Sequence, residues 1–78
     1  MIKEIKVVEV NNGVATEKSY LTEDVQFKTK KQKGTIMIGF AESGKLRNTW
    51  IKVLPNVWSV EVYEATTGRK MKTLYSKK

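Results

Sequence analysis

Hydrophobic and polar residues alternate in short runs along the whole chain, and no stretch spaces its hydrophobic residues at helical intervals. Alternation with a period of two is typical of β-strands that bury one face. The clearest run covers residues 35–41, where Ile36, Ile38 and Phe40 share one face. The other predicted strands span residues 2–10, 14–21, 46–54, 57–64 and 69–75, and residues 25–27 form a further short candidate.

Turn residues separate these runs. Asn12-Gly13 favours a tight hairpin, because both residues accept a positive φ. Residues 42–45 and 66–69 each place polar residues before a glycine and a base. This order predicts two three-residue hairpins, with the glycine of each in the left-handed conformation.

Two segments give weaker signals. Residues 28–34 are basic and polar, and we expect a loop there. Thr22, followed by two acids, is predicted to cap a single helical turn. In the first strand the hydrophobic parity changes between Val7 and Val8, which predicts a β-bulge or burial on both faces.

The two glycine hairpins imply a strand register. In the first, the predicted partners are Phe40–Leu46, Ile38–Asn48 and Ile36–Trp50. In the second, they are Val60–Leu74, Val62–Lys72, Tyr63–Met71 and Glu64–Lys70. These registers place both tryptophans, Trp50 and Trp58, in the core beside Leu46 and Leu74.

Length and composition limit the fold to one domain over residues 1–78. No disulfide can form, because the chain contains no Cys. We expect an all-β fold: a small antiparallel barrel or sandwich of five to six strands, SH3-like or OB-like, with at most one helical turn. Such a domain is marginally stable by itself, so a homo-oligomer is an alternative, paired through the polar edge strand at residues 14–21.

The charge of the chain gives information about its partner. The sequence contains 15 Lys and Arg but only 8 Asp and Glu, a formal net charge of +7. The basic excess lies in the second two-thirds of the chain. A surplus of this size favours an anionic partner. The candidate nucleic-acid-binding residues are Lys28, Lys30, Lys31, Lys33, Lys45, Arg47, Arg69, Lys70 and Lys72. If the hairpin tips lie side by side, we expect them to merge with the lysine segment into one patch.

Aromatic residues lie between these bases, as in proteins that stack the bases of single strands. Tyr63 and Tyr75, together with Met71, are the candidates for stacking or for a protein interface. Trp50 and Tyr20 are secondary stacking candidates, since inward parity favours a core position for Trp50.

Catalysis finds little support in the sequence. The chain has no His and no Cys, which removes the commonest general base and the usual zinc ligands. Residues 39–46 resemble a phosphate-binding loop, but Leu46 stands where the metal-binding Ser or Thr belongs and no helix pattern follows. We therefore expect no enzymatic activity, no metal and no cofactor.

Besides a structural protein that assembles into homo-oligomers through residues 14–21, two functions remain from the sequence. The first is a small protein that binds the phosphate backbone of DNA or RNA with little sequence specificity. The second is a phage or mobile-element type of accessory module, an inhibitor or adaptor that binds an acidic host protein. The N-terminal residues resemble no signal peptide and no run is apolar enough to span a membrane, so we expect a cytoplasmic protein without membrane insertion.

Overall fold

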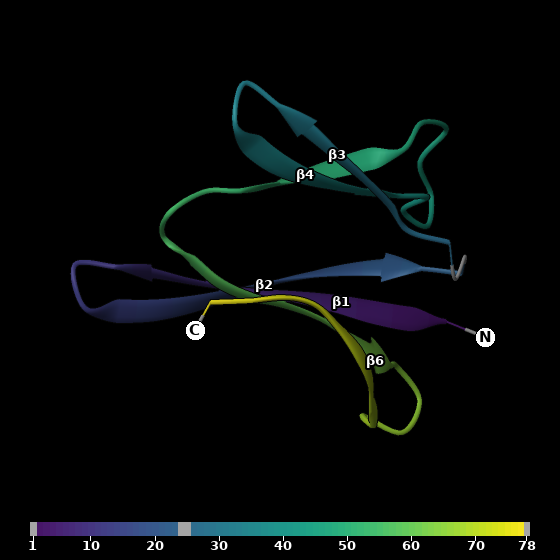
Figure 1. Ribbon diagram of the computed structural model, residues 1–78. Helices are drawn as coiled ribbons and strands as arrows, with labels where there is room; N and C mark the ends of the chain where they lie inside the picture. The colour runs from purple at the N-terminus through teal and green to yellow at the C-terminus, as the bar shows by residue number, and fades with distance from the viewer. Residues whose placement is uncertain (1, 24–25, 78) are drawn as a thin grey trace.

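The chain forms two antiparallel β-sheets, shown as separate layers in Figure 1. The computed structural model describes residues 2–23 and 26–77. Within them lie β1 (Lys3–Asn11), β2 (Val14–Thr22), β3 (Lys28–Gln32), β4 (Thr35–Phe40), β5 (Thr49–Val53), β6 (Val57–Glu64) and β7 (Lys70–Ser76). One sheet has the order β2-β1-β6-β7 and the other has the order β3-β4-β5. The prediction of an all-β domain is confirmed.

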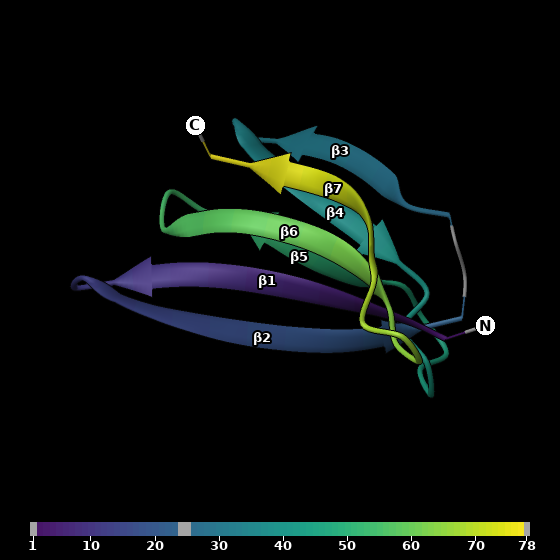
Figure 2. The ribbon, with the colours of Figure 1, turned by 90° about the horizontal axis from the view of Figure 1, so that it is seen from below.

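The hydrophobic core lies between the two layers. The four-stranded sheet contributes Ile5, Val7, Val57, Val60 and Val62, and the three-stranded sheet contributes Ile38, Phe40 and Ile51. The ring of Tyr20 meets that of Phe40 edge to face at 5.8 Å between centroids. Strands of both layers run in roughly aligned directions in Figure 2, which is the usual arrangement when twisted sheets pack face to face.

The closed barrel predicted as one alternative is wrong, and so is the count of five to six strands. The two sheets are joined at one corner, where Thr22 at the end of β2 forms an isolated bridge with Glu42. No helix occurs in residues 2–23 and 26–77. Thr22 instead ends β2, while the rest of the predicted helical turn and short strand includes residues 24 and 25, which lie outside the described part of the chain.

The additional strand is β3, which lies where we expected a loop. Lys33 and Gly34 have φ values of 52° and 80°, nearly those of Asn12 and Gly13 in the predicted first hairpin. Two consecutive positive φ values form the tight turn that matches the twist of paired strands. Gln32 therefore lies opposite Thr35, and the lysine-rich segment pairs with β4 as an exposed edge strand. Lysine is well suited to an edge, because its charge blocks further pairing.

The predicted hairpin at residues 42–45 is wrong in its register. Gly44 has the expected left-handed φ of 83°, but Glu42 and Ser43 bond to the end of β2, with Ser43 N donating to Leu21 O at 2.7 Å. These backbone groups are thus unavailable to the next strand, and β5 starts only at Thr49. Gly39 consequently lies opposite Trp50, and Leu46 is fully exposed instead of buried.

Trp58 is also outside the core, with 50% of its surface exposed. Val8 pairs with Ser59 and Glu9 pairs with Val57, so Trp58 is the extra residue of a β-bulge. The bulge reverses the parity of β6 and turns Val57 inward in place of the tryptophan. The pairing of β1 with β6 does shift between Val8 and Glu9, but the extra residue belongs to β6 and not, as predicted, to the first strand.

The last hairpin agrees with the prediction in its middle only. Val62 lies opposite Lys72 as expected, and Gly68 has a left-handed φ of 74°. Bulges on both sides shift the pairing by one residue, so Val60 faces Tyr75 and Tyr63 faces Lys70. Leu74 and Tyr75 both pack against the core as a result.

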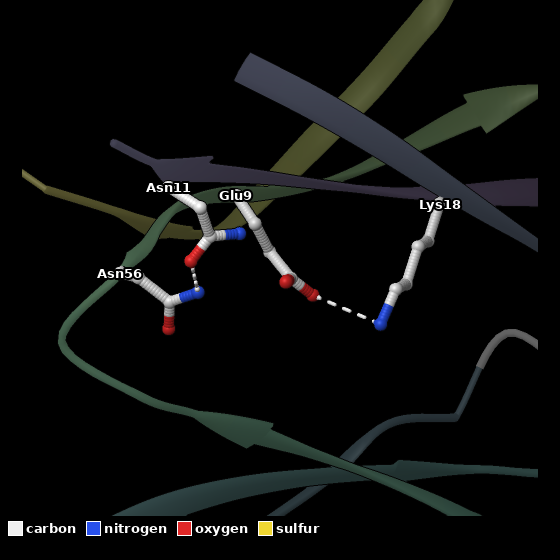
Figure 3. A network of polar contacts seen from close by, with 4 residues as sticks. All are labelled: Glu9, Asn11, Lys18 and Asn56. Atoms are coloured by element: carbon white, nitrogen blue, oxygen red, sulfur yellow. Dashed lines mark hydrogen bonds and ion pairs between the residues drawn. The ribbon is translucent and has the colours of Figure 1, made fainter. Parts of the chain in front are cut away.

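The crossover from β5 back to β6 is held by polar contacts at the far end of the sheets (Figure 3). Asn56 Nδ2 donates to Asn11 Oδ1 at 3.0 Å, and Val10 N donates to Asn56 O at 2.9 Å. Beside them, Lys18 Nζ lies 3.3 Å from Glu9 Oε1 (Figure 3). These contacts satisfy polar groups where the apolar core ends.

Candidate nucleic-acid interface

The outer face of the three-stranded sheet collects basic and aromatic side chains. Directly paired residues point to the same side of a sheet, and Ile38, Phe40 and Ile51 point inward. The residues of the opposite parity therefore form the outer face, which is the upper surface in Figure 1. We call this surface the basic face; its central residues are Lys28, Lys30, Met37, Gly39, Trp50 and Lys52.

Folding separates charge between the two sheets. Strands β3, β4 and β5 contain Lys28, Lys30, Lys31 and Lys52 and no acidic residue. The strands of the four-stranded sheet, by contrast, contain equal numbers of basic and acidic residues: Lys3, Lys6, Lys18, Lys70 and Lys72 against Glu4, Glu9, Glu17, Glu61 and Glu64. The positive excess of the strands thus belongs to one layer.

The centre of the basic face is a stack of three residues from three strands. A Cβ placed on Gly39 would lie 2.7 Å from Cε3, Cζ3 and Cη2 of Trp50. These are consecutive atoms of the six-membered ring, and a point equally far from all three lies on the axis through the ring centre. The indole is therefore flat against the backbone of Gly39. Lys30 Nζ also lies over the indole of Trp50, 4.2 Å from a ring centroid.

Only glycine permits this arrangement at position 39, because any side chain would push the ring away. Covering a strand glycine with an aromatic ring compensates for the side chain that glycine lacks. Since the backbone occupies the inner face of the indole, the ammonium of Lys30 is left with the outer face. The contact is a cation–π interaction at the surface of the sheet.

A hollow of about 330 Å³ adjoins the stack at the β3–β4 turn. It is lined by Gln32, Lys33, Thr35, Met37, Lys52 and Leu54. Lys33 and Lys52 are cationic and no carboxylate contributes to the lining. The hollow therefore extends the positive surface beyond the indole.

Three lysines of the other sheet already have partners. Lys70 Nζ lies 2.8 Å from Glu61 Oε2, Lys18 pairs with Glu9, and Lys6 Nζ lies 4.6 Å from the ring centroid of Tyr63. The hydrogen bond from Lys70 holds the pKa of Glu61 below its ordinary value, and the bond to Glu61 raises the pKa of Tyr63. Within residues 2–23 and 26–77, Lys28, Lys30 and Lys52 form no ion pair.

The structure places the predicted lysine segment in two settings. Lys28 and Lys30 belong to the basic face, and Lys33 lies at its end in the β3–β4 turn. Lys31 lies opposite Ile36, on the inward parity, although it remains exposed at the edge. Lys45 and Arg47 lie at the other end of β4, on the exposed connection 41–48.

The remaining predicted bases belong to the four-stranded sheet. Arg69 lies in the β6–β7 turn, Lys70 is paired with Glu61, and Lys72 Nζ lies 5.5 Å from the ring centroid of Phe27. The single patch expected from the hairpin tips does not form, because the β3–β4 turn and residues 41–48 occupy opposite ends of β4.

The predicted aromatic interface is also divided. Tyr75 packs against the core, whereas Tyr63 lies on the outer face of β6 and donates its hydroxyl to Glu61 at 2.9 Å. Met71 is 48% exposed. The three residues thus do not form one continuous aromatic surface.

Sequence reasoning found only part of the basic face. Lys52 was not a candidate, and Trp50 was preferred as a core residue. Gly39 was the available signal: a small residue in a strand often marks a close approach from a neighbour. Its alternation with Ile38 and Phe40 also places it on the outer side.

Comparison with known protein families, with curated proteins and with solved structures gives no match. Residues 2–23 and 26–77 contain no helix long and apolar enough to cross a membrane. They also bring together no group of three carboxylate, His or Cys side chains able to hold a metal ion.

Proposed function

We propose that this protein binds nucleic acid through the basic face, by contacts to the phosphate backbone and with little sequence readout. The observation that carries the proposal is the separation of charge: the strands of one sheet are acid-free and lysine-bearing, while those of the other are balanced. Lysine is suited to phosphate contacts that require charge and reach more than fixed geometry.

A flat sheet face suits this role better than a pocket does. The strand lysines Lys28, Lys30 and Lys52 lie around one aromatic centre and are free of ion pairs among the described residues. Each has an ammonium on a flexible stem, which tolerates variation in the spacing of phosphates. The face offers no ordered array of side-chain acceptors for discriminating one base from another.

The test is binding measured by fluorescence anisotropy at several salt concentrations, using labelled DNA and RNA oligonucleotides. Replacing Lys28, Lys30 and Lys52 together by Gln should weaken binding and reduce the slope of log K against log salt by about 2, since each phosphate contact contributes about 0.7 on single strands. The matched control replaces Lys6, Lys18 and Lys70 by Gln, which changes the formal net charge equally.

The control variant should bind more tightly than the basic-face variant at every salt concentration. Equal losses in the two variants would show that only net charge matters and would overturn the assignment to this face. Absence of binding by the native protein at low salt would overturn the function. Recovery of an acidic protein partner after nuclease treatment, without nucleic-acid binding, would instead support the accessory-module alternative.

A further inference from the structure

We infer that Trp50 is a base-stacking platform and that the basic face therefore prefers single-stranded nucleic acid to duplex. The inference rests on the proposed function and adds the substrate class. It starts from the stack described above, in which the indole of Trp50 lies flat on Gly39 with Lys30 over the ring.

An indole held flat on a sheet has its rotational freedom already restricted. A base that stacks on it does not have to order the ring, because Gly39 supports one face and leaves the other for a ligand. Stacking of this kind tolerates any base, since every base has a π-face. This tolerance fits a surface that offers little hydrogen-bond readout.

Lys30 currently covers the outer face of the ring, and a base must displace its ammonium. The displaced ammonium can bind a phosphate, because the nucleic-acid strand that supplies the base also supplies a phosphate. An exposed cation–π contact is weaker than a base–aromatic stack, so the exchange favours the bound state. Lys30 thus changes partner from indole to phosphate as the base arrives.

Duplex nucleic acid cannot make the same contact. Its bases are stacked on one another and only their edges are accessible in the grooves. A duplex can still contact Lys28 and Lys52 through its phosphates, but Trp50 contributes nothing to the affinity for the duplex. The difference in affinity between single-stranded and duplex nucleic acid therefore measures the contribution of stacking on Trp50, separately from the contribution of charge.

Trp58 provides a matched control within the same chain. It is half exposed, and Lys77 Nζ lies 5.8 Å from its ring centroid. It belongs to the bulge of β6 in the four-stranded sheet, so it lacks the lysines of the basic face. Comparing Trp50→Ala with Trp58→Ala separates a specific platform from a general effect of removing an exposed tryptophan.

The experiment measures anisotropy with labelled strands of about 12 nucleotides, a length within the ~4–16 nucleotides that one OB fold, also a small β-domain, covers. The ligands are oligothymidylate, oligouridylate, an abasic strand of the same length and a duplex. Trp50→Ala should weaken binding to the better of the two base-bearing strands about 5- to 100-fold, and leave the abasic strand and the duplex unchanged. Trp58→Ala should leave all four unchanged.

A second measurement covers the case in which Trp50→Ala unfolds the protein. In a Trp58→Phe variant, Trp50 is the single tryptophan, and its fluorescence should be quenched by the base-bearing strand and unaffected by the abasic strand. Equal losses on base-bearing and abasic strands, or no quenching, would overturn the platform while leaving salt-dependent binding, and the proposed function, standing. No binding to any of the four ligands would overturn both.

Discussion

Lys70 Nζ lies 2.8 Å from Glu61 Oε2, and the other oxygen of this carboxylate accepts the hydroxyl of Tyr63 at 2.9 Å. The two donors hold the pKa of Glu61 below its ordinary value of 4.5. The ionised carboxylate is therefore more favoured in the folded chain than in the unfolded one. This contribution to stability is complete above about pH 4.5 and is lost as the pH falls through the lowered pKa.

Glu61→Gln should consequently destabilise the protein more at pH 7 than at strongly acidic pH. The pair lies at the surface, where screening keeps such effects small, so the comparison between pH values is more informative than either value alone. Urea unfolding of both proteins at the two pH values measures the difference. An equal loss at both would show that the ionised carboxylate contributes nothing.

The same contact predicts a change in the titration of Tyr63. The bond to Glu61 raises the pKa of this phenol above 10.0. Glu61→Gln should lower it, because the glutamine side chain carries no negative charge to disfavour the phenolate. Ultraviolet absorbance of the tyrosinate during an alkaline titration follows the change, and subtracting the titration of Tyr63→Phe isolates this residue. An unchanged titration would contradict the contact.

Gly39→Ala tests the support beneath Trp50. The new methyl group would lie where the ring centre now approaches, so the indole must move outward. We expect the free energy of unfolding to change by no more than about 1 kcal/mol, because the ring is at the surface and alanine suits a strand better than glycine. Near-ultraviolet circular dichroism in a Trp58→Phe background should lose the signal of the ordered indole. An unchanged spectrum would contradict the flat packing.

Gly34→Ala tests whether the lysine segment is a true hairpin. Gly34 has a φ of 80°, and an alanine there costs about 1–2 kcal/mol in the left-handed conformation. Lys33→Asn is the matched change at the neighbouring position, where φ is 52°, and it should be neutral or slightly stabilising. Thermal and urea unfolding measure both. No destabilisation by the alanine would indicate the flexible loop that the sequence alone suggested.

Phe40→Ala and Trp58→Ala test the assignment of inside and outside. Phe40 is 1% exposed and lies in the core, so its truncation should cost about 3–5 kcal/mol. That is a large share of the roughly 4–12 kcal/mol expected for a chain of this length. Trp58 is half exposed, so its truncation should lower the free energy of unfolding by much less. Comparable losses in urea unfolding would contradict the bulge that turns Trp58 outward.

The strands that alternate regularly were predictable from the sequence. In β4 the burial of Ile38 and Phe40 follows from period-two alternation, and Asn12-Gly13 forms its turn because both residues accept a positive φ. Lys28–Gln32 was not predictable in this way, since its strand conformation depends on pairing with β4. A lysine-rich segment has no hydrophobic face to reveal it.

The sequence by itself determined that this is an all-β chain with excess positive charge, because alternation, turn residues and composition are local properties. Only the tertiary structure decided that Trp50 lies outside on Gly39 and that Lys28, Lys30 and Lys52 share its face. The physical reason is that register depends on which distant backbone groups pair. The bond from Ser43 to Leu21 displaces the start of β5, and a shift of one residue turns a side chain from core to surface.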